Sequence, residues 1–201
     1  MTGLRERKKR QAHEAISAAA ITLFLERGFD EVSVAEVAAS AGVSKPTLFK
    51  YFPTKEDLVL HRVSDHQGEA ARVVRGRGTG ETPLAALHRH FLDGLARRDP
   101  VTGLNDHPEV LGYHRMVFGT PSLAARVLHH MALDEEALAA ALAEGTDELT
   151  ALLVAGQVLV TQRVLARRNW LILVGGATAE ETYPSAVAAA DHAFALLPGL
   201  P

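Results

Sequence analysis

The 201-residue sequence contains no cysteine, which excludes disulfides and any metal site built on thiolates. Aromatic residues make up only 5% of the chain, whereas 47% of its residues are apolar. The many Ala and Leu residues among these favour helix over sheet. The N-terminal residues are charged, so a secretory signal is not expected. The longest apolar run, over 149–160, is interrupted by Gly156 and Gln157, and we expect it to be too short to span a bilayer. These features predict a soluble, cytoplasmic, helical protein.

Charge is spread unevenly along the chain, whose formal net charge is −3. Residues 1–62 contain ten Lys and Arg against eight Asp and Glu, whereas the remaining residues contain eleven against sixteen. A slightly basic N-terminal part joined to an acidic body indicates two parts with different tasks.

The N-terminal residues 6–52 carry the start and stop signals of three helices. Gly28 ends the first helix, as glycine just past a last turn commonly does. Ser33 and Glu36 form a Ser-x-x-Glu capping box at the start of a short second helix. After a tight Ala-Gly-Val turn, Ser44 begins the third helix. Two short helices joined by such a turn make a helix-turn-helix, although an ordinary three-helix packing unit has the same signals.

The third helix combines side chains that suit the major groove of DNA. Lys45 can reach guanine O6 and N7, and Thr47 suits a base edge or a thymine methyl group. Leu48 and Phe52 are four residues apart, so they share the face expected to pack on the first two helices. The later polar groups, the start of the second helix and the basic N-terminal arm suit phosphates or the minor groove. The predicted DNA-binding residues are Arg7, Lys8, Arg10, Ser33, Val34, Ser44, Lys45, Thr47, Lys50, Tyr51 and Lys55.

Residues 8–58 resemble the DNA-binding domain of the TetR family of transcriptional regulators. The matching pattern is AAAITLFLERGFDEVSVAEVAASAGVSKPTLFKYFPTKEDL. The resemblance implies a homodimer, in which each subunit has a DNA-binding head (1–53) and a C-terminal ligand-binding and dimerisation domain (54–201). Phe49 stands where the family often has Tyr, so we expect it to pack and not to contact a phosphate.

The rest of the chain is also predicted to be helical. A helix is expected from Thr54 toward Val74, followed by a flexible connection over 75–83. Further helices are expected over 84–95, 108–118, 121–144, 147–173 and 180–197. The helix over 147–173 is apolar around most of its circumference, which requires burial on all sides. Together with the last helix it is predicted to form the dimer interface, as the final two helices usually do in the family. The fold class is therefore all-α, with a three-helix head and a larger helical bundle.

A ligand pocket in the body is expected to use polar or aromatic side chains that interrupt apolar stripes. The candidates are His88, Phe91, Tyr113, Met116, Val117, Gln157, Thr161 and Trp170. The alternative for each of them is an ordinary core residue, which a lone His or Gln on an apolar face usually is. The apolar surroundings favour a hydrophobic or amphipathic small-molecule effector.

Metal and enzyme functions find little support in the sequence. Although there are ten histidines, the pairs His88/His90 and His129/His130 diverge on a helix and have no ligand spacing. No metal and no cofactor is therefore expected. Gly-rich phosphate loops, a nucleophile elbow and His-Glu-x-x-His are absent from the sequence, so an enzyme is not predicted.

The leading hypothesis is a ligand-responsive repressor that binds a palindromic operator in double-stranded DNA as a homodimer. A small effector would release it by favouring a head separation that does not match successive major grooves. The alternative is a DNA-binding regulator without a small-molecule effector, controlled by a protein partner. The sequence does not reveal the operator, the regulated genes or the effector, and repression over activation follows only the family's usual behaviour.

Overall fold

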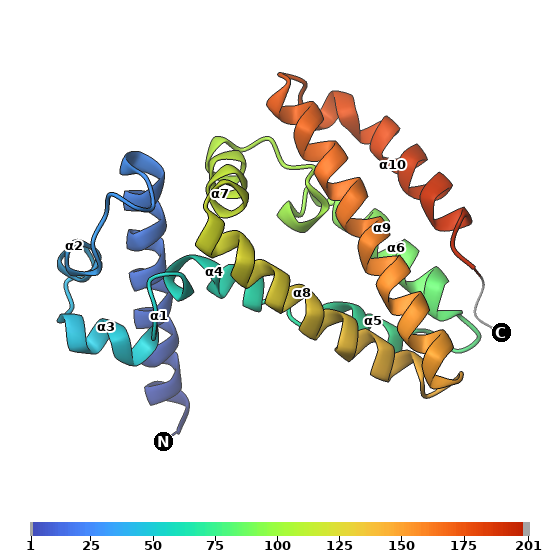
Figure 1. The fold of residues 1–201 in the computed structure, drawn as a ribbon, viewed down its shortest axis with the longest axis horizontal. Helices are drawn as coiled ribbons and strands as arrows, with labels where there is room; N and C mark the ends of the chain where they lie inside the picture. The colour runs from blue at the N-terminus through green and yellow to red at the C-terminus, as the bar shows by residue number, and fades with distance from the viewer. Residues whose placement is uncertain (1, 199–201) are drawn as a thin grey trace. The chain divides into compact units, whose positions relative to one another are not determined.

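The computed structural model describes residues 2–198, apart from the side chains at positions 2, 4–6 and 8–10. Every regular element in this range is a helix (Figure 1), which confirms the all-α prediction. The elements are α1 (Thr2–Arg27), α2 (Val34–Ser40), α3 (Lys45–Tyr51), α4 (Asp57–Ser64), α5 (Glu69–Arg75), α6 (Pro83–Ala96), the 3₁₀ helix η1 (Pro100–Thr102), α7 (Pro108–Gly119), α8 (Pro121–Leu142), α9 (Glu148–Val174) and α10 (Ala179–Ala195).

The chain forms two compact units that do not follow the predicted domain boundary at 53/54. Unit 1 comprises the residues up to His66 together with segment 112–129, and unit 2 comprises Gln67–Leu111 and the residues from His130 onward. Unit 1 therefore contains α4 and parts of α7 and α8 in addition to the helix-turn-helix. The boundary between a DNA-binding domain and a ligand-binding domain at 53/54 stays a prediction.

Three helix ends in unit 1 lie where the sequence predicts them: the end of α1 and the starts of α2 and α3. The Ser33 hydroxyl accepts a hydrogen bond from the Glu36 N–H at 3.3 Å, and the Glu36 carboxylate accepts one from the Ser33 N–H at 2.8 Å. This reciprocal pair is the predicted capping box of α2. At the start of α3 the Ser44 hydroxyl accepts from the Thr47 N–H at 3.2 Å. Gly28 directly follows the last residue of α1, so these three local predictions are confirmed.

The helix expected to run from Thr54 to Val74 is wrong as a continuous element. The contact expected at its start is present, since the Thr54 hydroxyl accepts from the Asp57 N–H at 3.2 Å, but α4 itself begins only at Asp57. The helix stops at Ser64, however, and α5 begins only after Gly68, whose φ of +69° lies in the left-handed region. The Gly68 N–H donates to Asp134 Oδ1 of α8 at 2.7 Å. A distant acceptor therefore satisfies a backbone donor that a continuous helix would have used itself.

Unit 2 is built around α9, which lies beside α10 (Figure 1) and also contacts η1. One face of α9 is buried through residues such as Val154, Val158 and Leu165. The opposite face is exposed in the single chain, so the predicted burial on all sides is not reached within one copy. Its exposed large apolar side chains are Leu149, Leu152, Leu153, Val160, Val164, Leu171 and Val174.

Helix α9 is long enough and apolar enough to cross a membrane, judged by length and composition alone. The expectation that this segment is too short is therefore wrong, because the helix continues through Gly156 and Gln157 without a break. The core helix of a soluble protein meets the same criterion, so this finding alone is weak support for a membrane span.

A close approach holds the loop after η1 against α9. Gly103 has a φ of +70°, and a Cβ atom added there would overlap the backbone carbonyl group of Ala166. Beside it, the buried Asn169 donates from Nδ2 to the Thr102 carbonyl at 3.0 Å. Only glycine leaves room for the loop at this distance from the helix.

Gly103→Ala is therefore expected to lower the free energy of unfolding by at least about 3 kcal/mol, through overlap combined with backbone strain. Gly80→Ala is the matched control, because Gly80 has a similar φ of +80° but no atom near the added Cβ. It should cost only the left-handed strain, about 1–2 kcal/mol. Urea unfolding followed by circular dichroism measures both, and equal losses would contradict the close approach.

Candidate nucleic-acid interface

Helix α3 has one buried face and one exposed face. Leu48 and Phe52 are 0% and 1% exposed, whereas Ser44, Lys45, Thr47 and Lys50 are all exposed. The buried pair fixes the rotation of the helix about its own axis. The four predicted DNA-binding side chains at the start and along the outer face of α3 are therefore free to meet a large partner.

The two hydroxyl groups at the start of α3 lie in contact with each other. Ser44 Oγ and Thr47 Oγ1 are 2.8 Å apart, and the Ser44 oxygen also caps the helix. The Thr47 hydroxyl is thus held in one orientation at the N-terminal end of α3, while its side chain stays exposed. In helix-turn-helix proteins this end of the second helix contacts base edges.

Phe49 is not buried, so the expectation that it packs inside the head is wrong. Its side chain is 39% exposed, and Lys45 Nζ lies 5.8 Å from the centre of its ring. Residues four apart are neighbours on a helix surface, and both Phe49 and Lys45 are exposed. Leu48 and Phe52 already fill the inner side.

Two predicted phosphate-binding residues, Tyr51 at the end of α3 and Lys55 just beyond it, are half-buried. Lys55 Nζ lies 4.4 Å from the centre of the Phe29 ring and 5.5 Å from that of Phe24, so the rings hold the ammonium group at the start of α4. Tyr51 is half-buried, with its ring centre 6.4 Å from that of His13. Contacts of Lys55 and Tyr51 with DNA stay predictions.

The start of α2 is exposed at Ser33 and half-buried at Val34, but a carboxylate already occupies part of it. Hydrogen bonds from Ser33, together with Arg27 at 2.8 Å, lower the pKa of Glu36 to about 2. Because Glu36 takes the Ser33 N–H, a phosphate at this end would have to use the N–H groups of Val34 and Ala35. In the N-terminal arm, Arg7 is exposed, whereas the side chains of Lys8 and Arg10 lie outside the described residues.

Sequence reasoning missed a histidine cluster that joins α1, the end of α3 and α4. The His13 ring stacks on Phe52 with ring centres 4.2 Å apart, and the His61 ring centre is 5.0 Å from that of His13. Ser17 Oγ donates to the Leu58 carbonyl at 3.0 Å and lies 2.9 Å from His61 Nδ1. Since the Ser17 proton is used, Nδ1 of His61 carries the donated hydrogen. No local signal connects these residues, because they come from different helices.

Burial in this cluster lowers the pKa of His61, and the charge on His13 lowers it further. Nearby, Arg62 acts in the same direction, whereas Asp65 and Glu14 oppose the shift. When the pKa of a histidine is lower in the folded protein than in the unfolded chain, the neutral histidine favours the folded state and the protonated histidine opposes it. Its contribution is complete above the unfolded pKa of 6.5 and is lost as the pH falls below that value.

We therefore expect the free energy of unfolding to fall more steeply between pH 7 and pH 5 in the wild type than in His61→Gln, whose amide can still donate to Ser17. His107→Gln, at an exposed position, is the control and should follow the wild-type profile. Urea unfolding at pH 5, 6, 7 and 8 provides the test. Parallel profiles for wild type and His61→Gln would show that His61 protonation does not oppose folding.

Among the predicted ligand-binding residues of unit 2, His88 and Phe91 meet at Phe194 of α10. The His88 ring stacks on Phe194 at 4.8 Å between ring centres, and the Phe91 ring centre is 6.2 Å away from that of Phe194. His88 Nε2 also lies 2.9 Å from Asp191 Oδ1. His88 lines a hollow of about 240 Å³ between α6 and α10, whereas Phe91 is buried in the core.

The other candidates are distributed over both units. In unit 2, Gln157 is exposed on α9, and Thr161 and Trp170 are half-buried. In unit 1, Val117 is buried and Met116 is half-buried. The Tyr113 hydroxyl donates to the Val59 carbonyl of α4 at 2.9 Å, and burial raises its pKa to about 12. The described contacts do not gather these residues into one pocket, so their ligand role stays a prediction.

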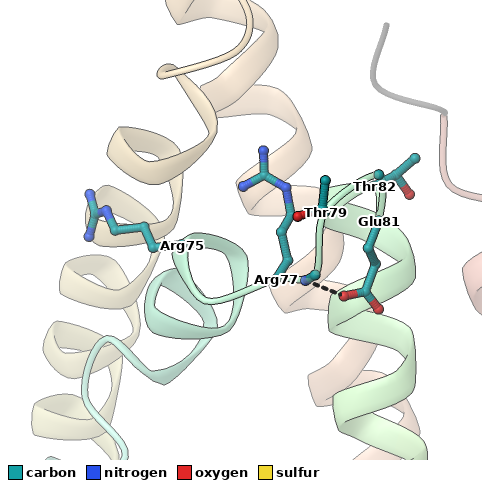
Figure 2. A pocket seen from close by; sticks show the side chains of 7 residues that line it. Arg75, Arg77, Thr79, Glu81 and Thr82 are labelled. Carbon is teal, nitrogen blue, oxygen red and sulfur yellow. Dashed lines mark hydrogen bonds between the residues drawn. The ribbon is translucent and has the colours of Figure 1, made fainter.

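A second hollow, of about 480 Å³, lies over the α5–α6 connection and contains none of the predicted residues. Figure 2 shows that the guanidinium of Arg75 points away from that of Arg77. Arg75 donates to Glu144 at 3.0 Å, Arg77 donates to the Val74 carbonyl, and Glu81 accepts from the Gly78 N–H. The charged groups in this polar hollow therefore already have partners within unit 2.

The helix-turn-helix and the all-helical body define a class of DNA-binding regulators, and comparisons with known proteins agree. Residues 16–61 match the family model of bacterial regulatory proteins, tetR family. Over 148 residues the chain is 32% identical to the HTH-type transcriptional regulator TcmR of Streptomyces glaucescens. The match covers 72% of this chain and 66% of TcmR. The chain belongs to the TetR family.

Solved structures show the same fold at lower sequence similarity. NalD, the secondary repressor of the MexAB-OprM multidrug efflux pump in Pseudomonas aeruginosa, is 17% identical with a TM-score of 0.63, over 92% of this chain and 97% of NalD. GusR of Salmonella enterica is 19% identical with a TM-score of 0.59, over 93% of this chain and 95% of GusR. The curated and structural relatives are regulators and not enzymes.

Proposed function

We propose that the protein is a cytoplasmic transcriptional repressor that binds double-stranded DNA as a homodimer and is released by a small hydrophobic effector. The observation that carries the proposal is the division of α3 into two faces. Leu48 and Phe52 hold one face of the helix in the core, whereas Lys45, Thr47 and Lys50 all remain exposed around the rest of it. Lysines and a hydroxyl in this arrangement can contact bases and phosphates in a major groove.

The exposed face of α9 supports a second copy of the chain as partner. Leu149, Val160 and Leu171 are spaced by eleven residues, and so are Leu153 and Val164. Eleven residues complete three helical turns, so these five side chains keep to one face along the whole helix. All five are exposed in the single chain. A twofold dimer that buries this stripe carries two heads, as many as a palindromic operator with two half-sites about 34–36 Å apart requires.

Repression is supported by NalD, which is named as a repressor, and the effector is supported by the family, in which a small-molecule effector is typical. The alternative is control by a protein partner, without a small-molecule effector. A thermal-shift screen with hydrophobic metabolites separates the two, because a ligand that binds only the native state raises the melting temperature.

Gel-shift binding to the DNA upstream of the gene tests the proposed function, with Lys45→Ala and Lys50→Ala as a matched pair on α3. Lys45→Ala should cost about 1–3 kcal/mol of discrimination at one base pair of each half-site. Lys50→Ala should weaken binding to all sequences alike and reduce the slope of log affinity against log salt by about 0.9 per subunit. Absence of wild-type binding at low salt would contradict DNA binding, and identical effects of the two variants would contradict the placement of α3.

Leu153→Glu is expected to convert the dimer to a monomer and to lower operator affinity, because a carboxylate would be buried in the apolar stripe. Leu128→Glu is the control, since Leu128 is similarly exposed but lies on α8. Analytical ultracentrifugation measures the oligomeric state. A Leu153→Glu protein that stays dimeric, or a wild type that is monomeric at micromolar concentration, would exclude this face as the interface.

A further inference from the structure

The start of α4 is held by one arginine from α8. Thr54 and Asp57 bond reciprocally around the turn that leads into α4, since the Thr54 N–H donates to Asp57 Oδ2 at 2.9 Å and the Asp57 N–H donates to Thr54 Oγ1. We call this pair, which ends at the first residue of the helix, the Thr54/Asp57 cap. Arg126 donates to both of these side chains. Its Nη1 donates to Thr54 Oγ1 at 2.8 Å, and its Nη2 donates to Asp57 Oδ1 at 2.7 Å. One planar guanidinium thus spans the two capping residues.

This cap lies directly after the helix proposed to meet DNA. Helix α3 ends at Tyr51, and only Phe52 and Pro53 separate it from Thr54. Phe52 is buried, and the ring of Pro53 restricts its own φ. Lys55, with its ammonium group beside Phe29, lies between the two capping residues. A fixed position of the cap therefore limits the movement of both the end of α3 and Lys55.

The contribution of Arg126 is expected to be orientation more than global stability. Its side chain is 41% exposed and that of Asp57 is 25% exposed, and ion pairs that solvent reaches add little to the free energy of folding. Two hydrogen bonds from one planar guanidinium nevertheless fix the orientation of the Thr54/Asp57 pair relative to α8. A lysine ammonium group on a flexible side chain would not fix it.

Segment 112–129, which contains Arg126, makes a second attachment to α4. The Tyr113 hydroxyl donates to the Val59 carbonyl in the middle of α4, and the Arg62 guanidinium lies 6.0 Å from the Tyr113 ring centre. The segment continues into unit 2 at both of its ends. It therefore contacts the start and the middle of α4 while it remains covalently joined to the body.

We propose that Arg126 is a positioning residue for operator binding: it holds the Thr54/Asp57 cap of α4, and thereby the end of α3, without contacting DNA itself. The inference rests on the proposed function, because it assigns Arg126 a role in the same DNA-binding site. It requires that changes at Arg126 act on specific binding and not on the general attraction between protein and phosphates.

The test compares Arg126→Lys, Asp57→Asn and the double variant on operator DNA that the wild type selects from a random-sequence pool, and on an unrelated duplex. Arg126→Lys keeps the charge but loses the planar guanidinium, and it should lower operator affinity about tenfold. Affinity for the unrelated duplex and the salt slope should stay at wild-type values, because no phosphate contact is lost. The double variant should be no weaker than the weaker single variant, since both remove the same contact.

Arg75→Lys is the matched control, because Arg75 pairs with Glu144 at 3.0 Å within unit 2, and it should bind the operator like the wild type. Melting temperatures of all variants show whether the fold is intact. Wild-type operator affinity in Arg126→Lys, additive losses in the double variant, or equal losses on operator and unrelated DNA would each overturn the role of Arg126. A wild type that selects no sequence would instead overturn the proposed function.

Discussion

The burial of Leu48 and Phe52 is the interaction on which the rest of unit 1 depends. Both side chains are removed from water almost completely, and each such burial is worth about 1.5–3 kcal/mol. The caps at Ser33 and Ser44 contribute about 1 kcal/mol each. Packing therefore decides which face of α3 turns outward, and the caps decide where the helices begin. Without the buried pair, the exposed lysines would have no fixed direction.

Sequence reasoning located features whose partners lie within one helical turn. Ser33 and Glu36, Ser44 and Thr47, and Asp147 with the start of α9 all interact over three residues, so their spacing alone predicts them. The break at Gly68 is different. It depends on Asp134 as acceptor, and Asp134 comes from a helix far along the chain. A local pattern of apolar residues continues across the break and gives no sign of it.

In the candidate site, too, features with partners nearby in the sequence could be predicted and features with distant partners could not. The outer face of α3 could be predicted because helical spacing places Leu48 and Phe52 opposite it. The histidine cluster and the Arg126 contact could not, since their members meet only through packing of separate helices. Phe49 shows a further limit: an aromatic side chain was expected to be buried, but the inner face had no remaining room. Surface aromatic residues are therefore poorly predicted without knowledge of what already fills the core.

Gln157 connects the two proposed tasks of the body. It was expected in a ligand pocket, yet it is exposed on α9 between Leu153 and Val160, within the stripe proposed to bind a second copy. A buried amide costs free energy unless it finds hydrogen-bond partners. In a twofold interface Gln157 would therefore need a partner from the other copy, and only some alignments of the two helices supply one. A single polar residue in an apolar stripe can in this way fix the register of the two subunits.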